Sequence, residues 1–186
     1  SSLMQCSGDG YFILPYTITD YLSAEIKTPK IKTDLPEFES AEKEVKDKIS
    51  KLLSINGKET PASYHRRLGQ IMWDYCGMVR NEEGLKKALV LIKELEEEFW
   101  KNLKVAGKGD EVNQELEKAG RVADFFELGR LLCLDALNRK ESCGAHFREE
   151  SQTDTGEAQR DDDHYSYVAA WEYKGDGQEH ELHKED

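Results

Sequence analysis

The chain has 186 residues and a formal net charge of −12, with 38% hydrophobic and 34% charged residues. This length can bury a core without disulfide or metal cross-links, and an acidic chain repels phosphate backbones, which argues against nucleic-acid binding. No apolar run approaches the roughly 20 residues of a membrane span, so the composition favours a soluble, mainly helical protein.

Residues 1–26 are expected to be helical, with a kink or a new start at Pro15. Residues 28–36 predict a loop, because a residue that precedes proline is disfavoured in the α region. From there apolar residues recur three or four positions apart, which is typical of amphipathic helices. The first such helix begins near Glu37, carries a stripe that ends at Leu52, and stops at the Asn56-Gly57 turn; the rest of its stripe is Phe38, Ala41, Val45 and Ile49.

Three more helices follow, each with its own start signal. Thr60 as N-cap and Pro61 at the first position begin one, and Asn81 caps the next. We expect Asp110 to cap the longest helix, which extends to about Arg139. Short connections predict that these helices pack antiparallel as a bundle of three to four helices.

After residue 141 the pattern changes. Residues 144–150 and 165–173 are typical of short strands. Residues 149–186 hold 13 acidic and 3 basic residues, which predicts a solvated, partly disordered end. The expected fold class is therefore mainly α, an antiparallel bundle followed by a short, acidic, β-containing C-terminal segment.

The sequence holds two candidate metal sites, and the residue spacing in each gives only a weak signal. His180 and His183 with Glu181 lack the H-E-x-x-H spacing, and a solvated tail is favoured. The acidic run at residues 161–163 with His164 lacks a cation-binding loop pattern, so surface charge is favoured. We predict no metal site.

The cysteines give no strong catalytic signal. Cys76 and Cys133 lie in apolar helical patterns, where buried, reduced thiols are expected, and no C-x-x-C pair occurs. Cys143 and His146 could form a thiol–imidazole pair, but in one strand the spacing would place them on opposite faces. Four aromatic residues are expected in the core rather than around a cofactor, namely Trp73, Tyr75, Phe99 and Trp100.

Three segments together resemble the flavoprotein subunit of succinate dehydrogenase and fumarate reductase. Residues 68–80 with Gly84-Leu85 resemble its L-Q-x-x-M-W-x-x-x-G-x-x-R…G-L stretch. Residues 136–148 resemble its A-x-x-R-x-E-S-R-G-A-H-x-R segment, and residues 160–163 followed by 168–171 resemble its R-D-D strand region. One departure is Cys143, where the family has arginine, so the contact made there and the role of Cys143 stay open.

The opening of the chain adds to the resemblance. Ser2-Leu3 resembles the end of the family's H-G-A-N-R-L-G-x-x-S-L run, whose Ser-Leu pair contacts the flavin through its backbone. The resemblance thus implies that Ser2 and Leu3 bind FAD in the full-length subunit. It also implies that this chain is a carboxyl-terminal portion, with both ends cut and with the catalytic, substrate-binding and flavin-attaching residues upstream.

The resemblance further implies domains and partners. Residues 1–36 would be the terminal helix and loop of the flavin-binding domain, 37–140 the helical bundle domain, and 141–186 the short-strand segment. The whole enzyme would interconvert succinate and fumarate and pass electrons to an iron–sulfur subunit and a membrane quinone-reactive anchor. It would lie at the cytoplasmic face of the membrane through those subunits, with the dicarboxylate bound by other domains. Residues 1–186 would have a structural and docking role. They would contain no catalytic residues and would be inactive alone.

Two alternatives stay open. A flavoprotein of the aspartate oxidase type shares the helical domain and has similar R-D-D and E-S-x-G-A-H segments. A stand-alone helical interaction module would instead pair with another protein through its bundle face. The physiological direction of the succinate–fumarate reaction cannot be read from these residues.

Overall fold

The computed structural model describes residues 2–175 and 178–185 and contains two compact units, the first ending at Glu44 and the second beginning at Val45. The first unit holds α1 (Ser2–Gly8), a π-helical turn (Asp9–Ile13), α2 (Leu14–Leu22) and a 3₁₀ turn (Ser23–Glu25). Pro15 lies in the first turn of α2, so the helix restarts there as expected. No residue of these four elements is buried, and Leu3, Tyr11 and Phe12 are largely exposed.

Helix α3 (Pro36–Ser54) begins in the first unit and ends in the second. Its predicted apolar stripe is mostly not used for packing, because Phe38 and Val45 are exposed and Leu52 is the buried residue of this helix. The Asn56-Gly57 turn is confirmed, with Asn56 in the left-handed region at φ 47°. Gly57 passes so close to the end of another helix that a Cβ would lie 2.1 Å from the Asn102 carbonyl carbon.

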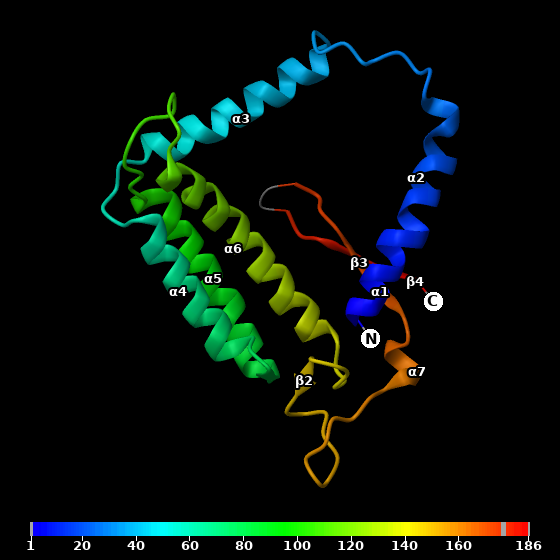
Figure 1. Ribbon diagram of the computed structural model, residues 1–186. Helices are drawn as coiled ribbons and strands as arrows, with labels where there is room; N and C mark the ends of the chain where they lie inside the picture. The colour runs from blue at the N-terminus through cyan, green and yellow to red at the C-terminus, as the bar shows by residue number, and fades with distance from the viewer. Residues whose placement is uncertain (1, 176–177, 186) are drawn as a thin grey trace. The chain divides into compact units, whose positions relative to one another are not determined.

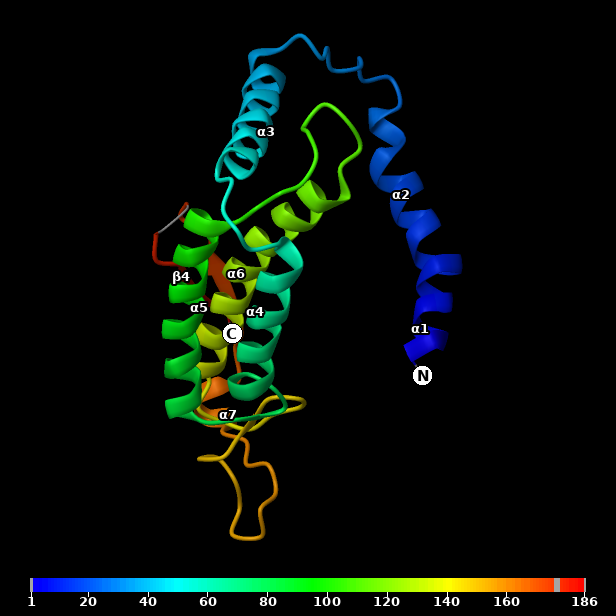
Figure 2. The ribbon, with the colours of Figure 1, turned by 90° about the vertical axis from the view of Figure 1, so that its left-hand side faces the viewer.

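The core of the second unit is a three-helix bundle of α4 (Pro61–Tyr75), α5 (Glu82–Asn102) and α6 (Gln114–Asn138), which lie side by side in Figures 1 and 2. The predicted caps of α4 and α5 are confirmed: Thr60 Oγ1 accepts from the Ser63 N–H, and Asn81 Oδ1 accepts from the Gly84 N–H. The predicted cap of α6 is wrong. Asn113, not Asp110, caps this helix.

Aromatic rings from all three helices pack together near the N-terminal end of α4 and the C-terminal end of α5. Tyr64 of α4 meets Phe99 of α5 edge-on at 5.2 Å between centroids, and Phe99 meets Phe126 of α6 at 5.3 Å. All three side chains are fully buried, and such pairs add to the stabilisation from apolar burial. The expectation that the aromatics are core residues holds for Phe99 and for the partly buried Trp100 and Tyr75, but Trp73 is 81% exposed.

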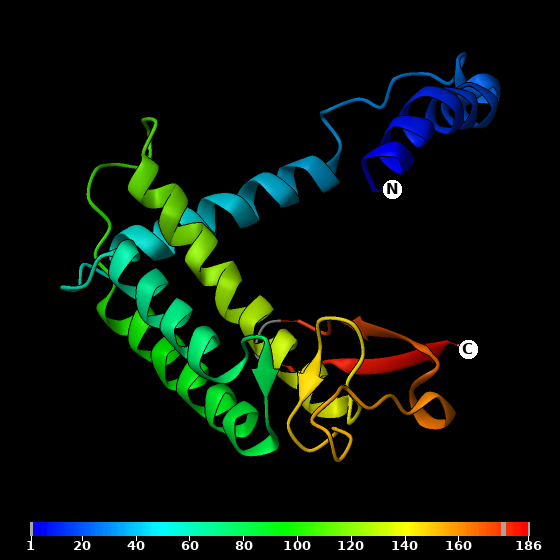
Figure 3. The same cartoon turned by 60° about the horizontal axis from the view of Figure 1, so that its bottom comes forward.

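The C-terminal segment contributes strands to two small sheets, one of which it shares with the connection between α4 and α5 (Figure 3). Strand β1 (Val79–Arg80) pairs in parallel with β2 (Phe147–Arg148), and β3 (Val168–Glu172) pairs antiparallel with β4 (Glu181–Glu185); the short helix α7 (Asp162–Tyr165) precedes β3. The mainly α fold class, with a bundle followed by short strands, is thus confirmed. Among the described residues of the acidic end, residues 181–185 do not form a free tail, because they return to pair with β3.

Candidate functional site

A cleft of about 350 Å³ lies where the last turn of α6 meets β1 and the turn that leads into β2. Basic and polar side chains line it together with a few apolar ones. The lining residues are Arg80, Leu132, Asp135, Ala136, Arg139, Cys143 and His146. Most of them stand in the segments on which the family resemblance rests.

The backbone of this site is built by a helix end and a tight turn. Helix α6 ends at Asn138, and its C-cap residue Arg139 still donates its N–H to the Asp135 carbonyl at 3.0 Å. Cys143 and His146 then face each other through two backbone hydrogen bonds of 2.9 and 3.0 Å, across a turn that holds Gly144 at φ 60°. A glycine favours this left-handed conformation because it lacks a Cβ. The parallel β1–β2 pairing then brings Arg80 beside Arg148.

Arg148 is the buried cation of the site. Its side chain is 3% exposed, and Nη1 donates to the carbonyls of Ala136 at 2.9 Å and of Leu137 and Arg139 at 3.4 Å each. The last carbonyls of a helix lack partners within the helix and carry partial negative charge. Arg148 therefore caps α6 with both hydrogen bonds and a complementary charge.

Arg139 fastens the C-terminal segment to the bundle. Its Nη1 donates to Glu141 Oε1 at 2.6 Å and to the Tyr165 carbonyl at 3.0 Å, while Nη2 donates to the Tyr167 carbonyl at 3.2 Å. The buried Glu141 also accepts from the Asp161 N–H at 2.9 Å through Oε2. Both partners of this ion pair thereby make further hydrogen bonds to the backbone, which offsets the desolvation of the buried carboxylate.

His146 is held as a neutral imidazole. Arg80 Nη1 lies 3.0 Å from Nδ1, and because arginine is always a donor, Nδ1 must accept. Nε2 then carries the proton and donates to the Arg139 carbonyl at 2.9 Å. Burial lowers the pKa of His146 and the charges of Arg80 and Arg148 lower it further, against the opposing effect of the Arg139 carbonyl.

The prediction that Cys143 and His146 lie on opposite faces of one strand is wrong. The structure does not support a thiol–imidazole pair either. They do not alternate along one strand but face each other across the Gly144 turn, and both line the cleft. The imidazole nevertheless has both nitrogens engaged by Arg80 and Arg139. It therefore has no free lone pair with which to deprotonate a thiol in this arrangement.

The β3–β4 hairpin docks onto α6 through polar contacts. Trp171 Nε1 donates to Asp135 Oδ1 at 2.7 Å, and Arg130 Nη2 lies 3.1 Å from His180 Nε2. His180 also contacts Glu127, and its side chain is 3% exposed. The expectation that His180 lies in a solvated tail is therefore wrong. Sequence spacing could not show this because the partners are about 50 residues away.

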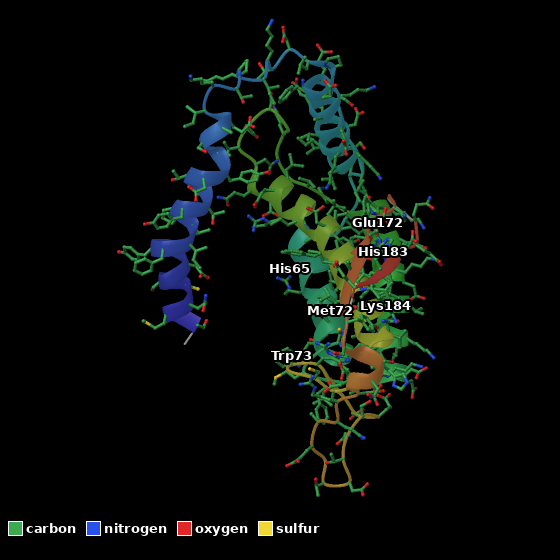
Figure 4. All side chains as sticks on the ribbon, turned by 90° about the vertical axis from the view of Figure 1, so that its right-hand side faces the viewer. His65, Met72, Trp73, Glu172, His183 and Lys184 are labelled. Atoms are coloured by element: carbon green, nitrogen blue, oxygen red, sulfur yellow. The ribbon has the colours of Figure 1, made fainter. Side chains whose placement is uncertain are left out.

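Among the described residues, Glu172, Glu181 and His183 bring ligand atoms within 4.8 Å of one another on the exposed side of the hairpin (Figure 4). Strand register explains the grouping, since Glu172 pairs with Glu181. Lys174 Nζ lies 2.9 Å from Glu172 and 2.7 Å from Glu181, so one ammonium group already pairs with both carboxylates. His164 donates to Asp161 at 2.9 Å on the surface.

Ser2 and Leu3 lie in the first turn of α1, where Leu3 is 84% exposed. Cofactor sites enclose most of their ligand within walls from several elements. One exposed helical turn cannot do this, so these two residues do not by themselves fit FAD. Their contact with FAD stays a prediction about a longer polypeptide.

The important residues that spacing alone did not single out are the arginines and their acceptors. Arg80, Arg139 and Arg148 stand in the motif segments, but their roles depend on tertiary contacts with α6 and with residues 165–167. Among the described helices, none is long and apolar enough to cross a membrane.

Residues 65–186 match the family model described as "Fumarate reductase flavoprotein C-term". This range covers α4 from His65 onward, α5, α6, the cleft and the hairpin. The chain is 36% identical over 110 residues to a FAD-dependent oxidoreductase of Methanocaldococcus jannaschii, which covers 59% of this chain and 19% of that protein. It is 33% identical over 133 residues to the fumarate reductase flavoprotein subunit of Helicobacter pylori, covering 70% and 18% respectively.

Solved structures agree on the fold. A chain of Escherichia coli quinol fumarate reductase superposes with a TM-score of 0.70 at 22% identity, covering 88% of this chain and 26% of that one. The present chain thus spans about a fifth of the length of the curated relatives it matches.

Proposed function

The chain belongs to the fumarate reductase flavoprotein C-terminal family, and from this we propose that it supplies the helical C-terminal domain of an FAD-containing subunit that interconverts succinate and fumarate. The observation that carries the proposal is the match over residues 65–186. It includes α4 from His65 onward, all of α5 and α6, and every residue that lines the cleft.

In this role the residues of the chain act by support and positioning. FAD, when bound in the complete subunit, would supply the hydride and electron chemistry. Arg148 keeps the end of α6 closed, Arg139 and Glu141 hold residues 161–167 against it, and His146 joins β1 to the helix end. These contacts tie β1 and residues 161–167 to the end of α6, and a neighbouring domain or subunit would dock on the surface that they form.

We extend the proposal to the partners of the complete enzyme. Electrons would pass from FAD to an iron–sulfur subunit and then to a membrane quinone-reactive anchor. The subunit would lie peripherally at the cytoplasmic face of that membrane. Support comes from two matched relatives named fumarate reductase and succinate dehydrogenase flavoprotein subunits.

The test compares residues 1–186 with the complete polypeptide encoded in the same reading frame. We expect the complete polypeptide to retain FAD and to reduce an artificial electron acceptor with succinate. Residues 1–186 alone should retain little FAD, because one exposed turn at Ser2 and Leu3 cannot enclose it. A complete polypeptide that holds no flavin would overturn the proposal.

A second candidate is a different FAD-dependent oxidoreductase, of the aspartate oxidase type. The observation that favours it is the 36% identity to a relative named only as a FAD-dependent oxidoreductase. The same assay separates the two, because this candidate requires flavin reduction by L-aspartate and not by succinate. A stand-alone interaction module requires that the native protein contain no flavin and form a stable complex through its bundle.

A further inference from the structure

Three side chains with metal-binding groups converge on the exposed face of the β3–β4 hairpin. Glu172 on β3 pairs with Glu181 on β4, and His183 follows two residues later on the same face of β4. One carboxylate oxygen from each glutamate and one imidazole nitrogen all lie within 4.8 Å of one another. Figure 4 labels Glu172 and His183 on the two neighbouring strands. Sequence spacing alone did not show this set, because Glu172 joins the other two through strand pairing.

A positive charge already lies where the two carboxylates converge. Lys174 Nζ is 2.9 Å from Glu172 Oε2 and 2.7 Å from Glu181 Oε2. One ammonium group balances only one of the two carboxylates, whereas a divalent ion would balance both. The surrounding segment also attracts cations, since residues 149–186 hold 13 acidic and 3 basic residues.

Lys174 can leave this position at little cost. Its side chain is 37% exposed, so the ammonium group can return to solvent. Ion pairs of this kind contribute little to stability, because water screens the charges and a long side chain must be held in one conformation. A metal ion that coordinates three groups at once therefore competes with a weakly held cation.

The imidazole of His183 decides which metal fits. Its Nε2 lies 2.7 Å from Glu172 Oε2 and donates a proton there, because an ionised carboxylate only accepts. A metal ion can take the place of this proton when the neutral imidazole carries its hydrogen on Nδ1 and offers the Nε2 lone pair. Calcium and magnesium take oxygen ligands, whereas Zn²⁺ binds imidazole nitrogen together with carboxylate oxygen. Two glutamates and one histidine therefore favour zinc.

The three side chains are free to adopt the geometry that zinc requires. Around a tetrahedral Zn²⁺ with bonds of about 2.0–2.2 Å, the ligand atoms lie roughly 3.3–3.6 Å apart. The present spacings bracket this value, from 2.7 Å between His183 Nε2 and Glu172 Oε2 to at most 4.8 Å within the set. Each side chain is about half exposed, so it can rotate without displacing core atoms.

We propose that Glu172, Glu181 and His183 form a zinc site in which the metal ion displaces the Lys174 ammonium group and a water molecule supplies the fourth ligand. The bound ion joins β3 to β4. Because Trp171 of the same hairpin is hydrogen-bonded to α6, the ion also strengthens the attachment of the acidic end to the bundle.

The test titrates zinc chloride into the purified, metal-free protein at neutral pH, with calorimetry for the Kd and amide hydrogen exchange for the location. We expect zinc to slow exchange in residues 168–172 and 181–185. E172Q and H183Q should each raise the Kd by at least about tenfold, since even outer-shell partners of a ligand contribute 10–100-fold. K174M removes the competing charge and should lower the Kd several-fold. The matched control E179Q removes a carboxylate of the same hairpin outside the set and should leave the Kd nearly unchanged.

Several outcomes would overturn the proposal. They are no zinc binding, equal affinity in H183Q and the unaltered protein, or a K174M variant that binds zinc no more tightly. Zinc held at Cys143 instead would show as an affinity that survives H183Q and is lost in C143S. The exchange map of the unaltered protein decides the question independently of any substitution, because zinc-dependent protection confined to segments outside β3 and β4 would also contradict the site.

Discussion

Replacing Arg148 with alanine should remove the cap of α6 and destabilise the second unit. The guanidinium makes one hydrogen bond of 2.9 Å to the Ala136 carbonyl and two longer ones to Leu137 and Arg139. A hydrogen bond to a charged group contributes about 1.5–3 kcal/mol, and a partly buried cation at a helix C-terminus up to ~2 kcal/mol. The pair with Glu150 adds little, because that carboxylate is 44% exposed.

These contributions sum to a loss of about 2–5 kcal/mol, a large part of the ~5–15 kcal/mol that stabilises a domain. Urea unfolding followed by tryptophan fluorescence measures it, since Trp73, Trp100 and Trp171, the three tryptophans of the chain, all lie in the second unit. R148K keeps the charge without the planar fork and should lose less.

The matched control is R121A, which removes an exposed arginine paired with Glu117 along the same helix. It should change the free energy of unfolding by less than about 0.5 kcal/mol. If R148A costs under about 1 kcal/mol with an unchanged denaturant slope, the capping role derived from the hydrogen bonds in the structure is refuted.

Three further substitutions test the packing and the site. G57A places a Cβ 2.1 Å from the Asn102 backbone and should lower the free energy of unfolding by about 3 kcal/mol. At Gly69 an added Cβ meets open space, so G69A should leave the stability unchanged or raise it. Equal urea midpoints for the two variants would contradict the close approach at Gly57. F126A should cost ~3–5 kcal/mol because Phe126 is fully buried, and its exposed neighbour Phe125 provides a milder control in F125A. Similar losses for the two variants would show that Phe126 is not a core residue. The pKa of His146 in the folded state is lowered from the ordinary 6.5. As the pH falls through 6.5, the imidazole is therefore protonated in the unfolded chain before it is protonated in the folded one, and the free energy of unfolding decreases. H146Q should therefore lose less stability than the unaltered protein between about pH 7 and pH 5, and identical pH slopes would count against the neutral imidazole.

The helices and most of their ends were predictable because their signals are local. Thr60 and Asn81 stand immediately before apolar periodic runs, and the structure uses both as caps. Asp110 and Asn113 are both acceptable cap residues in the loop before α6. The choice depends on the loop, since the Asn113 side chain also donates to the carbonyls of Ala106 and Lys108.

The cleft and the docked hairpin were not predictable from spacing, because their contacts join distant segments. Arg80 and His146 are 66 positions apart, and Arg130 and His180 are 50 apart. The apolar stripe of α3 was a true helical signal but a poor guide to burial. A face of that kind shows which side of a helix can pack and does not show whether a neighbour covers it.

The most direct test of the central claim is the flavin content and succinate-dependent reduction of the complete polypeptide that contains residues 1–186. We expect bound FAD, which succinate reduces, in the complete polypeptide, and its loss when only residues 1–186 are expressed. Tight FAD binding by residues 1–186 alone would contradict the supporting role assigned to this domain. A complete polypeptide without flavin would contradict the assignment to a flavoprotein subunit.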